Sequence, residues 1–298
     1  GPTGVTFYEN GALGDDWVGT YLSGEASRNT VFGYKPEPQG ATYSMDRFNF
    51  LTTRSLSSDI SEEERDERVH FRPSDISIGP DGAVYVADWY DPGSGGHATR
   101  DESSSGAIYR VAPKGFQSHT PKLNLSTISG QVDALLSPNP NVRFLGFKEL
   151  QKMGAKAYPK VSQLLSHKNP YLAARAIWLL PYLGDDGMKR VNKLLESNDS
   201  LSRLVAYRSV RRSGGKLVPQ ARKMAKDSSP GIRRDVALSM RPYTAKQANP
   251  VLAEVAKRYD GTDKNYVESI GLGAAGKEAE VWKYLRNKLG MQNPAKWD

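Results

Sequence analysis

The side chains best suited to chemistry lie in one short stretch, positions 72–97, where an arginine, several carboxylates and a histidine occur together. The candidates for a catalytic role are Arg72, Asp88 and His97. The candidates for binding a ligand beside them are Asp75, Trp89, Tyr90 and Asp91. Guanidinium, carboxylate and imidazole groups at strand ends could hold a hydroxyl group, a carboxylate or a calcium ion.

The same stretch also has a structural interpretation. Asp88 and Asp91 could cap turns. Trp89 and Tyr90 could pack between neighbouring sheets, while Arg72 forms an ion pair with a nearby carboxylate. Residue types and spacing do not decide between the catalytic and the structural interpretation, so both stay open at this point.

A second set of candidates is basic and could form a concave stripe that binds an anion. Its members are Arg203, Arg208, Arg211, Arg212, Lys216, Arg222 and Lys223. The anion could be a nucleic acid, an acidic protein surface or a sulfated sugar. A nucleic-acid site needs stacking aromatic rings, and Tyr207 is the only aromatic residue in this stretch, which disfavours nucleic acid. Alternatively, these side chains are solvated or cap helix ends.

Charge is distributed unevenly along the 298 residues, which carry 41 basic and 33 acidic side chains. Residues 1–128 have a balance of 11 − 18 = −7, and residues 129–298 have a balance of 30 − 15 = +15. Gly, Asp and aromatic residues are frequent in the first part, whereas Ala, Leu, Lys and Arg dominate the second. This change in charge and composition predicts two domains, 1–115 and 129–290, with a linker over 116–128 and a tail over 291–298.

The chain contains no cysteine, which excludes a disulfide scaffold, Cys-based zinc sites, iron–sulfur clusters, covalently attached c-type haem and a cysteine nucleophile. No apolar run approaches the ~20 residues that cross a bilayer, and the first residues show no signal-peptide pattern. We therefore expect no membrane-spanning segment within this sequence.

The basic part repeats every 30 residues. Successive units open at Pro140, Pro170, Ser200 and Pro230, where the start of a helix tolerates proline. A column of glycines, at positions 154, 184 and 214, is placed where helices end. Apolar residues at three- and four-residue spacing predict two amphipathic helices per unit, and hence a helical solenoid. The short period resembles that of short HEAT-like repeats.

The acidic part has the pattern of short strands separated by Gly, Pro and Asp turns. We expect strands over 5–8, 17–22, 30–34, 43–51, 75–78, 83–88 and 107–111. Gly-Pro-Asp-Gly at 79–82 predicts a tight turn between two of them. The segment that begins at Pro2 is similar to the one that begins at Pro73, and each has the size of a propeller blade.

Two blades are too few for a ring, which needs at least ~4. We therefore expect 1–115 to be a partial β-propeller of about two blades, completed by preceding sequence or by another chain. The fold class predicted is β plus α multidomain, with the last blades of a propeller followed by an α-helical, HEAT-like solenoid.

A resemblance to a known family rests on two segments. They are FRPSDISIGPDGAVYVADWYDPGSGGH (Phe71–His97) and GAIYRVAPKG (Gly106–Gly115). Together they resemble the closing blade of a bacterial family of membrane-bound dehydrogenases of the planctomycete type, which are similar to soluble glucose/sorbosone dehydrogenases. Such proteins continue from a six-bladed propeller into HEAT-like repeats and often into a cytochrome segment, and the order of parts here matches.

The resemblance implies oxidation of a sugar or sugar alcohol by the intact ring, outside the cytoplasm in the periplasm or after secretion. It also implies pyrroloquinoline quinone and calcium in the intact protein, with no cofactor expected in this fragment, which we expect to be inactive alone. Expected partners are the remaining blades or a cytochrome segment, although no C-x-x-C-H follows the repeats. The competing hypothesis is a non-catalytic scaffold whose basic solenoid binds a protein or a polyanion.

Overall fold

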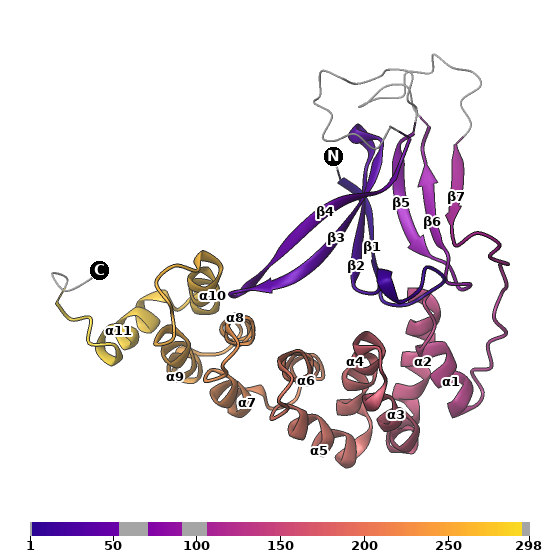
Figure 1. Ribbon diagram of the computed structural model, residues 1–298. Coiled ribbons are helices and arrows are strands. Elements are labelled where there is room, and N and C mark those ends of the chain that lie inside the picture. The colour runs from indigo at the N-terminus through magenta and orange to yellow at the C-terminus, as the bar shows by residue number, and fades with distance from the viewer. Residues whose placement is uncertain (1, 54–70, 91–105, 294–298) are drawn as a thin grey trace. The chain divides into compact units, whose positions relative to one another are not determined.

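A computed structural model describes residues 2–53, 71–90 and 106–293. Two compact units divide the chain (Figure 1). The first, which we name the sheet unit, comprises residues 1–37 and 45–150, and the second, the helical unit, comprises residues 38–44 and 151–298. The predicted order of β-structure followed by α-structure is confirmed. The turn of one hairpin, residues 38–44, belongs to the helical unit.

The sheet unit contains two small antiparallel sheets. The first has the order β1-β2-β3-β4, with bounds Pro2–Tyr8, Thr20–Glu25, Thr30–Gln39 and Thr42–Thr52. The second has the order β5-β6-β7, with bounds Pro73–Ile78, Val84–Asp88 and Ala107–Val111. Each expected strand overlaps an observed one. The strand expected at 17–22 begins later, because residues 15–17 form a short 3-10 helix, η1 (Asp15–Trp17), and Gly19 adopts a φ of 87°.

The two sheets share an irregularity in the same place. In the first, the pairing of Pro2 with Glu25 is followed by a register shift before Val5. In the second, the pairing of Pro73 with Asp88 is followed by a register shift before Asp75. The internal similarity of the sequence therefore extends to the hydrogen-bond register of the two sheets.

Strands β1 and β5 approach each other closely. A Cβ atom on Gly4 would lie 2.4 Å from the Cα of Asp75, so this position of β1 has room for glycine only. Between the sheets lies a core of apolar side chains: Tyr8, Leu22, Val31, Phe71, Ile76, Ile78, Val84 and Val86. The sheets are therefore held together mainly by burial of apolar surface.

The C-terminal region is helical throughout its regular structure. Helices α1 and α2, Ile128–Leu135 and Pro140–Met153, lead into the remaining ones. Their bounds are Tyr158–Gln163 (α3), Pro170–Leu179 (α4), Gly184–Leu194 (α5), Ser200–Arg212 (α6), Leu217–Met224 (α7), Pro230–Ser239 (α8), Ala245–Ala256 (α9), Lys264–Ala274 (α10) and Glu278–Lys288 (α11). The expected helix starts at 140, 170, 200 and 230 are confirmed, and Gly154, Gly184 and Gly214 have the positive φ expected at helix ends. Among the described residues, no helix is both long and apolar enough to span a bilayer.

Within the helical unit, the helices lie in two rows (Figure 1). Contacts link α4, α6, α8 and α10 in one row, and α7, α9 and α11 in the other. One continuous apolar core runs between the rows, from Ile177 to Leu285. The hairpin turn contributes Ala41 to this core, where its side chain is 1 % exposed.

Candidate functional site: the basic edge of the helical unit

Asp88, the central residue of the candidate catalytic group, is buried and fully engaged by the protein. Its Oδ1 accepts hydrogen bonds from the backbone N–H of Arg72 at 2.7 Å and of Tyr90 at 2.9 Å. Its Oδ2 accepts one from the hydroxyl of Tyr109 at 3.3 Å. Burial and the Asp88 carboxylate raise the pKa of Tyr109, which keeps this hydroxyl protonated as a donor. Asp88 therefore ties the start of β5 to the end of β6.

The other candidate residues of positions 72–97 have different local contacts. The carbonyl of Arg72 accepts a hydrogen bond from Trp89 N–H at 2.9 Å, while Trp89 as a residue is 56 % exposed. Tyr90 has a left-handed backbone with a φ of 51°. Asp75 uses Oδ1 to accept the N–H of Ile76 at 2.8 Å. His97 and Asp91 lie outside the described residues.

In the helical region, the turns that precede every second helix repeat one hydrogen bond. A side chain accepts the backbone N–H of the residue two positions later. The four acceptors are Ser137, His167, Ser197 and Asp227, spaced 30 residues apart. The next-but-one residues, Asn139, Asn169 and Asp199, then cap helices α2, α4 and α6. His167 is therefore a turn residue with the same role as Ser137 and Ser197. Asp227 is the acidic residue among these four acceptors.

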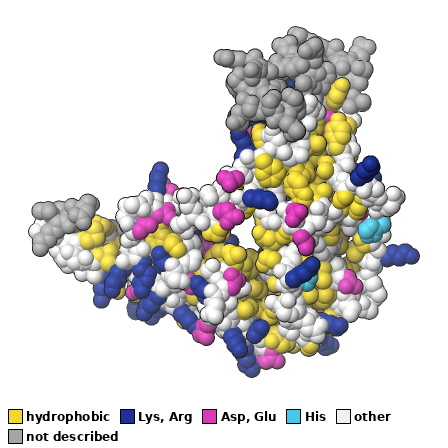
Figure 2. Space-filling model, viewed as in Figure 1, with side chains coloured by type: hydrophobic (Ala, Val, Ile, Leu, Met, Phe, Trp, Pro, Cys, Tyr) yellow, Lys and Arg dark blue, Asp and Glu magenta, His cyan; other side chains and the backbone are white. Residues whose placement is uncertain are grey.

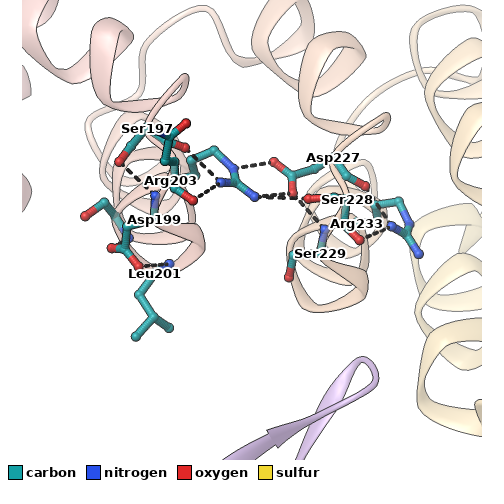
Figure 3. Close-up of polar contacts among 10 residues, drawn as sticks. Ser197, Asp199, Leu201, Arg203, Asp227, Ser228, Ser229 and Arg233 are labelled. Atoms are coloured by element: carbon teal, nitrogen blue, oxygen red, sulfur yellow. Dashed lines mark hydrogen bonds and ion pairs between the residues drawn. The ribbon is translucent and has the colours of Figure 1, made fainter.

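Arg203 is held in place by these turns (Figure 3). Its Nε and Nη2 donate to the two carboxylate oxygens of Asp227 at 2.7 and 2.8 Å, and its Nη1 donates to the carbonyl of Ser197 at 2.8 Å. One repeat later, Arg233 donates to the carbonyls of Asp227 and Ser228 and to the hydroxyl of Tyr266. Only 12 % of the Arg203 side chain is exposed. Arg203 therefore acts as a structural clamp between repeats.

Two further members of the predicted stripe are also paired with acids. Arg208 forms an ion pair with the buried carboxylate of Asp235, and Lys223 forms one with Glu196. The hydrogen bond and the charge of Lys223 hold the pKa of Glu196 below its ordinary value. These two cations are therefore partly neutralised by the protein itself.

The remaining members are exposed and lie at the ends of α6 and α7. Arg211 and Arg212 occupy the last turn of α6, Lys216 precedes α7, and Arg222 lies in the last turn of α7. Arg212 also stacks over the ring of Trp178, with 5.6 Å between the guanidinium carbon and the ring centroid. The seven residues are thus divided between α6 and the α7 segment, and four of them, Arg211, Arg212, Lys216 and Arg222, are exposed.

Two cations that the sequence interpretation missed extend this exposed group. Arg241 and Lys246 follow Arg211 and Lys216 by 30 residues each, at the α8–α9 turn, and both are exposed. We name Arg211, Arg212, Lys216, Arg241 and Lys246 the basic edge. The 30-residue period could have located both, because each lies 30 positions after a basic residue that the sequence interpretation had selected. Figure 2 shows Lys and Arg side chains along the lower side of the helical unit.

Contacts at the opposite ends of the same helices show why charge of one sign gathers here. Arg203 at the start of α6 reaches Asp227 before α8, and Arg233 at the start of α8 reaches Tyr266 at the start of α10. The first turns of these neighbouring helices therefore share one edge, and their last turns share the other. The first edge holds the acidic turn residues, including Asp199 and Asp227, whereas the sequence has no acid at 200–226 or 236–253.

Among residues 2–53, 71–90 and 106–293, Arg211, Lys216, Arg241 and Lys246 make no ion pair with a carboxylate. Arg211 and Arg241 lie at the C-terminal ends of α6 and α8, where the helix dipole stabilises a cation by about 0.3–1 kcal/mol. Lys216 and Lys246 lie at the N-terminal ends of α7 and α9, where the dipole gives no such stabilisation. The positive charge of all four is left without local neutralisation, and it is available to an anion.

Comparison with known proteins adds one family. Residues 1–115 match DUF7133, a domain of unknown function. The match covers the described strands of both sheets and ends before the first helix. No curated protein matches the chain significantly.

Proposed function

We propose that the protein is an interaction scaffold whose helical unit binds a polyanionic partner along the basic edge. The observation that carries this proposal is the segregation of charge between the two edges of the same helices. At one edge, arginines form ion pairs and hydrogen bonds that join neighbouring repeats, as Arg203 does with Asp227. The other presents cations of one sign at two successive turns.

The spacing of these cations suits an extended anion better than a small one. Arg211, Arg212 and Lys216 lie at the α6–α7 turn, which places three cations at one point of the edge. Arg241 and Lys246 repeat the α6–α7 arrangement one helix pair further along. A polymer or surface with regularly spaced negative charges could contact several of them together, which strengthens binding at low salt.

Nucleic acid is the less favoured polyanion. Tyr207, the aromatic residue within the basic stretch, is fully buried, and its hydroxyl is hydrogen-bonded to Ser239 at 2.6 Å. It therefore offers no face on which a base could stack. Sulfated or carboxylated polymers and acidic protein surfaces need no such platform.

The test is retention on a heparin column at increasing salt. The variant Arg211→Glu/Lys216→Glu/Arg241→Glu should elute at much lower salt than the unchanged protein. The matched control is Lys193→Glu/Lys226→Glu/Lys257→Glu, which changes the net charge equally at three exposed positions towards the opposite ends of the helices. If both variants lose retention equally, binding follows net charge and the proposed edge is wrong.

We further propose that the two sheets are successive blades of a β-propeller and that the helices form a HEAT-like solenoid. The equivalent register shifts near Pro2 and Pro73 support the first part, since each marks the same position of a repeated sheet. The close approach of β1 and β5 at Gly4 also supports it, because first strands of neighbouring blades converge near a propeller axis. The two helix rows support the solenoid.

The sugar dehydrogenase activity implied by the resemblance remains a prediction. Asp88 itself is poorly placed to hold a cofactor, because both of its oxygens already accept hydrogen bonds from protein donors. We assign pyrroloquinoline quinone and calcium to no residue here. Dye-linked oxidation of aldoses by the longest natural polypeptide, with quinone and calcium added, would test the activity. An unchanged rate in Asp88→Asn would place the chemistry elsewhere.

A further inference from the structure

We infer that a pocket in the first sheet binds an organic cation, the ammonium group of a lysine side chain on a basic peptide. The pocket is lined by Asp16, Trp17, Lys35, Glu37, Asp46 and Phe48, and its volume is about 640 Å³. All six belong to the sheet unit, and none belongs to the motif discussed above.

The floor of the pocket is aromatic. The ring of Trp17 lies 6.0 Å from that of Phe48 and 5.2 Å from that of Phe50, measured between centroids. The tip of the Phe48 ring lies against Gly33, where an added Cβ would come within 2.3 Å of its Cζ atom. Glycine at this position therefore makes room for the ring against β3.

The rim of the pocket is acidic. Lys35 and Glu37 alternate along β3 and so share one face with Gly33, while Asp46 and Phe48 share a face of β4. The three carboxylates of Asp16, Glu37 and Asp46 are exposed. They face one ammonium group, that of Lys35, which donates to the carbonyl of Asp16 at 3.3 Å. The lining thus carries a net charge of 1 − 3 = −2.

An aromatic floor with an acidic rim selects cations over neutral or negative ligands. A cation above an aromatic ring gains about 0.5–2 kcal/mol, and carboxylates add to this attraction. The other face of the same hairpin already shows such a contact, because Arg47 lies 4.7 Å above the ring of Phe32. The surplus negative charge of residues 1–128 would also attract a basic peptide.

The test is calorimetric titration with a six-residue lysine peptide at low salt, compared with the same peptide fully acetylated. We expect the lysine peptide to bind and the acetylated peptide not to bind. Glu37→Gln/Asp46→Asn should weaken binding about five- to tenfold, because each exposed ion pair contributes up to about 1 kcal/mol. The matched control is Asp133→Asn/Asp185→Asn, which removes the same charge at exposed positions outside the pocket and should change affinity less than twofold.

Trp17→Leu tests the aromatic floor and should weaken binding further, provided that its thermal unfolding shows a folded protein. Binding of N-acetyl-lysine amide at the same site would show that a single ammonium group is sufficient, and its failure would show that the peptide is required. Equal binding of the acetylated peptide, or equal losses in the pocket and control variants, would overturn the inference. Neither result bears on the basic edge, which has the opposite charge.

Discussion

Arg203 and Asp227 form a two-point ion pair that joins one helical repeat to the next, with both carboxylate oxygens accepting from the guanidinium. The Asp227 side chain is 6 % exposed, and it also accepts the N–H of Ser229. Asp227→Ala would leave a nearly buried guanidinium without its carboxylate. We expect the free energy of unfolding to fall by about 2–4 kcal/mol, measured by urea denaturation.

The comparison for that variant is the exposed pair of Lys223 with Glu196. Glu196→Ala should shift the urea midpoint far less, because exposed ion pairs contribute little. Arg203→Lys should recover only part of the stability, since one ammonium group cannot reproduce a planar two-point contact. Similar losses for Asp227→Ala and Glu196→Ala would contradict the clamp.

The lowered pKa of Asp227 leads to a prediction of how the stability of the protein depends on pH. Burial alone would raise its pKa, but the hydrogen bonds from Arg203 and Ser229 and the nearby positive charges hold it below the ordinary value. The unfolded chain therefore takes up a proton here at a higher pH than the folded protein does, so acid favours unfolding. The stabilisation is complete at neutral pH and is lost as the pH falls below about 4.

Thermal unfolding measured between pH 7 and pH 3 checks this expectation. The midpoint of Asp227→Asn should fall less steeply with acid than that of the unchanged protein, because the titrating group is gone. Asp185→Asn, which removes an exposed carboxylate, serves as the control. Parallel curves for all three proteins would show that other carboxylates dominate acid unfolding.

Local pattern was enough to predict most of the elements. Alternation and turn residues located the strands, and the 30-residue period located the helix starts at Pro140 and its equivalents. The tight turn at 79–82 was also predicted, and Asp81 supports it by accepting the N–H of Ala83 at 3.1 Å. These features depend on neighbours within a few residues, which the sequence displays directly.

The roles of the candidate site residues could not be predicted in the same way. Arg203 finds its carboxylate 24 residues later, across a repeat boundary, so its sequence neighbours gave no sign of pairing. Asp88 is engaged by N–H groups of the backbone, which every residue except proline carries. The pocket around Trp17 depends on which residues of two paired strands share a face, and composition alone does not reveal this.

Asp88 provides a third prediction. If its role is to join β5 to β6, Asp88→Ala should destabilise the sheet unit by about 2–3 kcal/mol, because it leaves two partly buried N–H groups without their acceptor. Asp88→Asn keeps one carbonyl oxygen and should cost clearly less. Thermal unfolding followed by circular dichroism distinguishes them. Full stability of Asp88→Ala would contradict the structural role.

Gly33 provides a fourth prediction. Gly33→Ala places a methyl group against the ring of Phe48 and should destabilise the protein by about 1–3 kcal/mol, as overpacking does. Gly33→Ala/Phe48→Leu should recover part of this loss, because the smaller side chain leaves room for the methyl group. Gly271→Ala is the control, since the space around Gly271 is open. Urea denaturation measures all three variants, and no recovery in the double variant would contradict the contact.

The hairpin turn at residues 38–44 has a consequence for how the chain is made. Ala41 donates its N–H to Asp263 at 2.7 Å, its carbonyl accepts from Arg234, and Asp263 also caps α10. These partners are 222 and 193 positions apart in the chain. At about 5–20 residues per second, the ribosome needs some tens of seconds to deliver Asp263 after Ala41 has emerged. During synthesis, an early segment must therefore wait for a late one, and this core cannot be completed before Asp263 has been translated.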